Sequence, residues 1–169
     1  SDIHLEGETA MNNSLTALCL SCLLLALPAC QYNDEPKEYY DLVDAYLAFY
    51  HDEISAEELL KLCDRALEKD AVGRPKFLEM VYSARNLVFL KAGDCGKAEE
   101  EARKAIAAGP GDNNKGWLTM SDTLAACGKL NDAADALEQM LDNPNLLPGE
   151  ADKYRELAAY YREAAKIRT

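Results

Sequence analysis

Hydrophobic side chains recur every three or four positions through most of the chain after residue 36. This spacing places them on one face of a helix and predicts amphipathic α-helices, while clusters of Gly, Pro and Asn separate the segments. No segment shows the two-residue alternation of a half-buried strand, so the predicted fold class is all-α. The predicted helices cover about 36–51, 55–70, 75–91, 95–108, 114–127, 130–142 and 150–168. Ser55 and Glu58 match a capping box at the start of the second helix.

An offset of 35 residues aligns the segment that begins at Tyr82 with the segment that begins at Trp117 and largely keeps the size of each side chain. The aligned pairs are Phe89 with Leu124, Gly93 with Gly128, Ala98 with Ala133, Ala102 with Leu137, and Ala105 with Met140. At an offset of 39 residues the same pattern recurs in a first unit further upstream, which keeps the side-chain sizes less closely. Arg85 and Asn86 stand where the tetratricopeptide repeat, which this pattern resembles, usually has Leu and Gly.

This pattern of paired helices, with Gly93-Asp94 at a turn, spaced small residues and a closing Pro110, resembles the tetratricopeptide repeat. The resemblance implies a stack of three antiparallel helix hairpins and a C-terminal capping helix, all within a single domain over 36–169. A small side chain is needed where two helices cross closely, and the larger side chains fill the space to the next hairpin. The alternative is an ordinary helical bundle whose periodicity is accidental.

In that family the first helix of each hairpin lines a concave groove that binds a protein or peptide. Several tyrosines lie in the first predicted helix, and aromatic side chains are favoured anchors at protein interfaces. The resemblance therefore implies a groove near the N-terminal end of the domain, lined in part by tyrosines of this helix. The same tyrosines also fit a second interpretation, in which terminal hairpins use them to cover the core while the hydroxyl stays in water. The groove candidates are Tyr39, Tyr40, Tyr46, Met80, Ser83 and Leu87.

Three cysteines lie in the predicted domain. In a stack of hairpins Cys95 and Cys127 would fall at the same end of adjacent hairpins, so a disulfide between them is one prediction, and free thiols that fill core space are the other. Cys63 fits a packing position. No CxxC pair occurs among them and His51 is the single histidine of the domain, so neither a metal site nor a cofactor is predicted.

The N-terminal segment 11–29 reads as a signal peptide, because its apolar stretch over 15–29 is short for a membrane span. Its end, Leu27-Pro28-Ala29-Cys30, resembles the lipobox of bacterial lipoproteins, which implies lipidation of Cys30 and a tether over 30–35. Residues 1–10 precede Met11, the expected start. Gln31 after the cysteine favours the periplasmic side of the outer membrane. An uncleaved apolar helix is the alternative.

The formal net charge of −12 disfavours nucleic acid as a partner, since an acidic surface repels phosphates. After the predicted signal peptide the chain has one histidine and three serines, which is little material for nucleophilic catalysis, so no catalytic residue and no enzyme activity are predicted. The leading hypothesis is a membrane-tethered adaptor that binds a protein or peptide of the cell envelope. The alternatives are an envelope enzyme that acts on glycans through paired carboxylates and a homo-oligomer built by end-to-end stacking.

Overall fold

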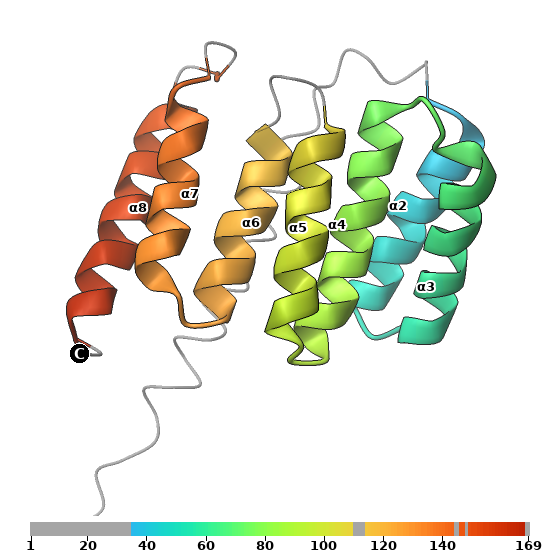
Figure 1. The fold of residues 1–169 in the computed structure, drawn as a ribbon, viewed down its shortest axis with the longest axis horizontal. Helices are drawn as coiled ribbons and strands as arrows, with labels where there is room; N and C mark the ends of the chain where they lie inside the picture. The colour runs from blue at the N-terminus through green and yellow to red at the C-terminus, as the bar shows by residue number, and fades with distance from the viewer. Residues whose placement is uncertain (1–34, 110–113, 144–145, 148, 168–169) are drawn as a thin grey trace, which may run out of the picture. The chain divides into compact units, whose positions relative to one another are not determined.

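The computed structural model describes residues 35–109, 114–143, 146–147 and 149–167, and these ranges contain seven α-helices and one short π-helical turn (Figure 1). No strand occurs within them, which confirms the prediction of an all-α fold with about seven helices. The predicted signal peptide and Cys30 lie outside the described residues. The elements are α2 (Lys37–Tyr50), α3 (Ala56–Arg65), η1 (Ala66–Asp70), α4 (Pro75–Lys91), α5 (Cys95–Ala108), α6 (Asn114–Ala126), α7 (Leu130–Leu141) and α8 (Glu150–Ile167).

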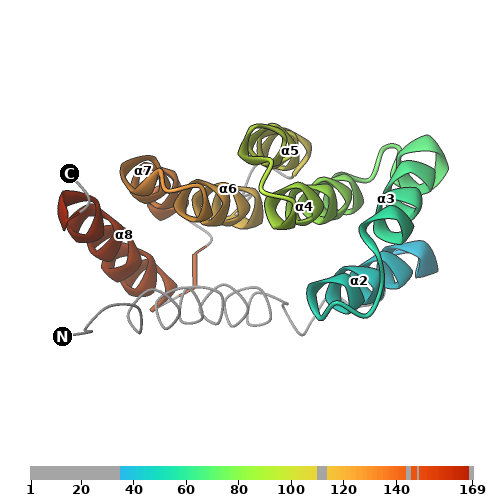
Figure 2. The ribbon, with the colours of Figure 1, turned by 90° about the horizontal axis from the view of Figure 1, so that it is seen from below.

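Each of these helices packs against the next one along the chain, and α4 also contacts both α2 and α6. Figure 2 shows the α4–α5 and α6–α7 hairpins next to each other, with α2 and α3 beyond α4 and α8 beyond α7. Residues 35–169 form a compact unit. Within the described part of the chain, no helix has the length and the apolar character that a membrane span requires.

Three turns between paired helices have the same backbone geometry. At each one a residue with positive φ follows the first helix: Asp52 (φ 61°), Gly93 (φ 73°) and Gly128 (φ 78°). The next N–H then donates to a carbonyl five residues back, as Asp94 does to Phe89 at 2.9 Å. This is the Schellman ending, which satisfies carbonyls that the helix leaves unpaired and which favours glycine at the left-handed position. In the first hairpin an aspartate, Asp52, occupies this left-handed position.

The 35-residue offset of the sequence also relates two buried hydrogen bonds within the hairpins. Asn86 Nδ2 donates to the Ala98 carbonyl at 2.7 Å, and Ser121 Oγ donates to the Ala133 carbonyl at 2.9 Å. Each bond joins the first helix of a hairpin to the second helix close to the crossing point. The small residues expected at these crossings have no exposed surface, namely Ala98, Ala102, Ala105 and Ala133.

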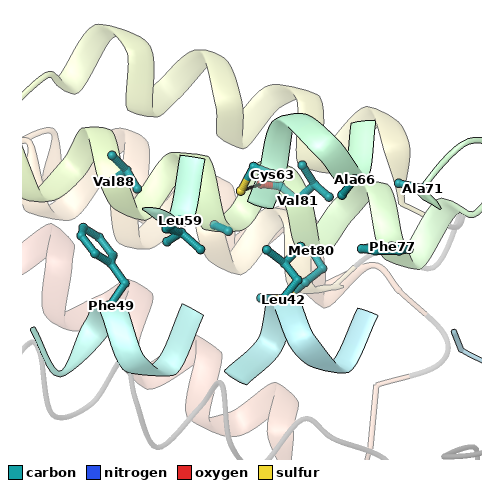
Figure 3. Close-up of a cluster of buried hydrophobic side chains, with 11 residues drawn as sticks. Leu42, Phe49, Leu59, Cys63, Ala66, Ala71, Phe77, Met80, Val81 and Val88 are labelled. Atoms are coloured by element: carbon teal, nitrogen blue, oxygen red, sulfur yellow. Dashed lines mark hydrogen bonds between the residues drawn. The ribbon is translucent and has the colours of Figure 1, made fainter. Parts of the chain in front are cut away.

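The N-terminal part of the core lies between α2, α3 and α4 (Figure 3). Phe77, Val81 and Leu59 are fully buried there, next to the free thiol of Cys63. Burying such side chains contributes roughly 1.5–3 kcal/mol each relative to leaving them exposed. This cluster joins the first hairpin to the rest of the described unit.

The predicted helix over 55–70 is divided in two. The capping box at its start is present, since the Glu58 amide donates to Ser55 Oγ at 3.2 Å and the Ser55 amide donates to the Glu58 carboxylate at 2.8 Å. Its last turn widens into η1, where the Ala71 N–H donates to the Ala66 carbonyl at 2.9 Å. Ala71 is fully buried. The wider turn therefore carries a small apolar residue into the core.

Candidate functional site

The six groove candidates lie on two helices that contact each other, α2 and α4. Tyr39, Tyr46 and Leu87 are partly buried and pack against the N-terminal core, and Met80 belongs to that core with 3 % of its surface exposed. Ser83 is buried at 6 % exposure. The structure thus brings the six residues to neighbouring helices, and four of them also take part in packing.

Tyr40 differs from the other candidates, because it is half-buried beside Tyr39 and is not part of the core cluster. The ring centroids of Tyr39 and Tyr40 are 5.4 Å apart at an interplanar angle of 87°, and Tyr39 in turn lies 5.6 Å from Phe77. Edge-to-face pairs of this kind hold aromatic rings in fixed orientations. Tyr40 is therefore positioned by a chain of rings that ends in the core.

Lys115 on α6 contacts one of the groove candidates, and it was not singled out from the sequence. Its ammonium group lies 3.5 Å from the Met80 sulfur, so it joins α6 to α4. Burial lowers the pKa of Lys115, while the nearby charge of Glu79 opposes that shift. A lysine 35 residues after Met80 occupies the equivalent repeat position, and that alignment is the signal by which it could have been found.

A second feature is a shallow depression between α2 and α3 with a volume of about 530 Å³. Small and aliphatic residues from α2, α3 and the turn between them form much of its lining, and charged groups stand among them. Sequence analysis missed it because it depends on how two helices diverge. The lining residues are Asp44, Ala45, Ala48, Ile54, Glu58, Lys61, Leu62 and Arg65.

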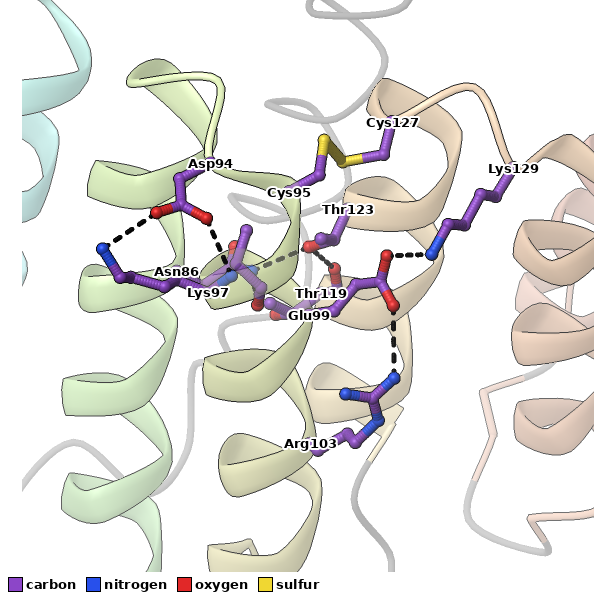
Figure 4. Close-up of a disulfide and its surroundings, with 11 residues drawn as sticks. Asn86, Asp94, Cys95, Lys97, Glu99, Arg103, Thr119, Thr123, Cys127 and Lys129 are labelled. Carbon is purple, nitrogen blue, oxygen red and sulfur yellow. Dashed lines mark hydrogen bonds and ion pairs between the residues drawn. A yellow bond between two sulfur atoms is a disulfide. The ribbon is translucent and has the colours of Figure 1, made fainter.

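Cys95 and Cys127 are joined by a disulfide, with their Cα atoms 5.9 Å apart (Figure 4). That separation lies in the usual range for disulfides. Cys95 is the first residue of α5 and Cys127 directly follows α6, so the bond connects neighbouring hairpins. Cys63 is a buried free thiol, and burial raises its pKa to about 12. It therefore remains protonated at neutral pH.

Next to the disulfide, the Glu99 carboxylate binds cations from two elements (Figure 4). Arg103 lies 3.2 Å away on the same helix, and Lys129 reaches it from the start of α7. In the same region Asn86 Nδ2 donates to Thr123 Oγ1 at 2.8 Å, and Thr123 Oγ1 donates to the Thr119 carbonyl at 2.7 Å. These polar groups satisfy one another, and the network therefore holds helices together.

Arg85 on α4 connects three helices through its ion pairs. Its guanidinium lies 2.6 Å from Asp64 on α3 and 3.1 Å from Glu101 on α5. The Glu101 side chain is only 5 % exposed, and Lys104 also binds it at 3.0 Å. A buried carboxylate requires such partners, because water no longer solvates it.

Several carboxyl groups have pKa values below their ordinary range. Hydrogen bonds from Ser55 lower the pKa of Glu58, those from Lys97 lower the pKa of Asp94, and one from Lys104 lowers the pKa of Glu100. A general acid for glycan cleavage needs a raised pKa, so these three groups do not suit that role. Among the described residues, no group of three or more His, Cys, Asp or Glu side chains is placed to hold a metal ion.

No family model, no curated protein and no solved structure matches this chain. Function therefore has to be inferred from the residues and their geometry.

Proposed function

We propose that this protein is a lipid-anchored adaptor of a bacterial cell envelope that binds another protein on the side formed by α2, α4 and α6. The observation that carries the proposal is the contact of α4 with both α2 and α6. Consecutive first helices of the hairpins are neighbours in this arrangement, as they are in tetratricopeptide-repeat proteins. Tyr40 and Lys115 then belong to one continuous binding side, and the buried Met80 contacts Lys115 from α4.

The chemistry of this side suits a protein partner. Tyr40 offers a half-buried aromatic ring whose orientation is fixed by Tyr39, and such rigid aromatic side chains carry much of the binding energy at interfaces. The formal net charge of −9 over residues 30–169 favours a basic or neutral partner, because complementary charge speeds association and excludes acidic competitors. A short segment or helix of an envelope protein has the dimensions that a few helices can hold.

The proposed anchor is the lipidated Cys30 that follows the apolar stretch. A diacyl anchor has two chains, which suffices for stable attachment, whereas a single chain binds only marginally. α2 begins at Lys37, so the chain between the anchor and the first helix spans at most about 25 Å. The domain is thus held close to the membrane surface, where it would meet partners in the same membrane or in the periplasm.

Replacement of Cys30 by Ala is expected to release the protein from the membrane fraction, since the acyl chains would have no attachment point. Expression in a bacterial host, fractionation and metabolic labelling with a fatty-acid analogue measure this directly. Cys63→Ala serves as the matched control and should leave both the label and the membrane fraction unchanged. Continued membrane retention and labelling of the Cys30→Ala protein would refute the lipid anchor.

Replacement of Tyr40 by Glu is expected to weaken capture of the partner tenfold or more, the usual effect of losing one interface anchor. The experiment immobilises a chain that begins at Glu35 and identifies proteins retained from a bacterial envelope extract by quantitative mass spectrometry. Val72→Glu, which makes the same change of charge at a hydrophobic residue 67 % exposed, is the control and should retain the same protein. The adaptor function is wrong if nothing is retained specifically, or if Tyr40→Glu retains as much as the unmodified chain.

A further inference from the structure

The depression between α2 and α3 lies on the side of these helices that faces away from α4. Leu42 and Phe49 on α2, and Leu59 and Cys63 on α3, belong to the buried cluster shared with α4. The residues that line the depression occupy other helical positions, and none comes from α4. In a row of hairpins this is the place where a preceding helix would pack, because each hairpin leaves an apolar face for its neighbour.

The floor of the depression is suited to a large side chain from another helix. Ala45 and Ala48 are small residues on α2, and Leu62 adds aliphatic surface from α3. Small residues let a neighbouring helix approach closely, so that its side chains enter the groove between two helices.

Lys61 and Arg65 stand one turn apart along the α3 edge, and the acidic Asp44 and Glu58 also line the depression. Lys61 pairs with Glu57 at 2.6 Å, but both side chains are more than 70 % exposed, so its ammonium group can exchange to another carboxylate.

α8, the last described helix of the chain, carries a surface complementary to this depression. α8 packs on α7, and its buried residues Tyr154, Ala158 and Tyr161 define the inner face. At 100° per residue the opposite face centres on Glu156 and Glu163, with Tyr160 and Ile167 beside them. Tyr160 is 46 % exposed and Ile167 is 86 % exposed, so large hydrophobic groups lie next to acidic ones.

We propose that α8 of one copy of this chain docks into the α2–α3 depression of a second copy. Tyr160 would cover the small residues Ala45 and Ala48, while Glu156 and Glu163 approach Lys61 and Arg65. Lys166 now pairs with Glu163 at 2.6 Å, but both side chains are about 70 % exposed, and such a surface pair costs little to exchange.

Such a contact joins two different surfaces and leaves one free surface of each kind at the ends. It is therefore heterologous and generates an open chain of molecules, or a ring where the rotation between successive copies closes. On an anchored protein, this head-to-tail contact would repeat the binding side of α2, α4 and α6 along the membrane. The inference does not depend on the adaptor function, because neither Tyr40 nor Lys115 takes part in the contact.

The test measures mass against concentration by sedimentation equilibrium, from about 10 µM to 1 mM, the range in which small interfaces associate. It uses a chain that begins at Glu35, because the described core belongs to the compact unit over residues 35–169. The unmodified chain should grow beyond two copies as concentration rises. Ala48→Arg blocks the depression and Tyr160→Lys blocks α8, so each variant alone should remain a single chain.

A mixture of the two blocked variants is the decisive sample. The intact α8 of Ala48→Arg can bind the intact depression of Tyr160→Lys, and the product has no further free surface. The mixture should therefore form a species of two chains and nothing larger. Thermal unfolding of each variant establishes that it is folded, and Val72→Arg, at a residue 67 % exposed outside the proposed contact, should associate like the unmodified chain.

Three results would each overturn the inference. The first is an unmodified chain that remains a monomer at 1 mM. The second is a mixture of the two blocked variants, each shown to be folded, that contains no species of two chains. The third is association that survives in both blocked variants, which would place the contact elsewhere. A double variant, Lys61→Glu with Arg65→Glu, is an independent test. Loss of these two positive charges should weaken association between copies tenfold or more.

Discussion

Reduction of the Cys95–Cys127 disulfide is expected to lower the free energy of unfolding by about 3–4 kcal/mol. The two cysteines are 32 residues apart in sequence, so the bond restricts a loop of that length in the unfolded chain. The entropy of closing such a loop corresponds to about 3.7 kcal/mol at 25 °C. Because whole domains are stable by only about 5–15 kcal/mol, this is a large fraction of the total.

Chemical unfolding in guanidinium chloride, with and without a reductant, measures the effect. A Cys95→Ala, Cys127→Ala variant should unfold at the same low denaturant concentration in both conditions, because it has no bond to reduce. In a chain that begins at Glu35 the third cysteine is Cys63, a free thiol with no bond to reduce. It is buried and protonated in the folded state, so it does not attack the disulfide. An unfolding midpoint of the unmodified chain that does not respond to reductant would contradict the stabilising role.

The helices could be predicted from the sequence because their limits depend on local chemistry. Pro75, Gly93 and Gly128 act within one turn of the chain, and the Ser55 capping box satisfies N–H groups three residues away. The described helix ends agree with the predicted ranges to within one residue, apart from the division at η1. At that division the last turn widens and Ala71 is buried in the core, a tertiary contact that periodicity does not contain.

The candidate site was predicted less completely, and the reason is physical. A helix between two neighbours has apolar residues on the faces that pack and on the face that binds, and spacing alone does not separate them. Met80 and Leu87 therefore entered the predicted groove although they pack in or against the core. The α2–α3 depression was missed because its depth depends on the distance between helices.

Arg85→Met is expected to lower the free energy of unfolding by about 2–3 kcal/mol, because it leaves the buried Glu101 carboxylate without its guanidinium partner. Removing one member of a buried ion pair typically costs about 3–5 kcal/mol. We expect the lower value because Lys104 still binds Glu101 at 3.0 Å and because Arg85 itself is 22 % exposed. Methionine keeps most of the packing volume, so the change isolates the charge.

Three further variants, beginning with Glu101→Met alone, separate the charge effect from packing. Arg85→Met combined with Glu101→Met removes both buried charges and should recover most of the lost stability, since an apolar pair of similar size often replaces a buried ion pair without loss. Asp64→Asn removes the other partner of Arg85, but the Asp64 side chain is 63 % exposed, so little change is expected. If the losses of the two methionine substitutions simply add, or if Asp64→Asn costs as much as Arg85→Met, the buried carboxylate is not what Arg85 stabilises.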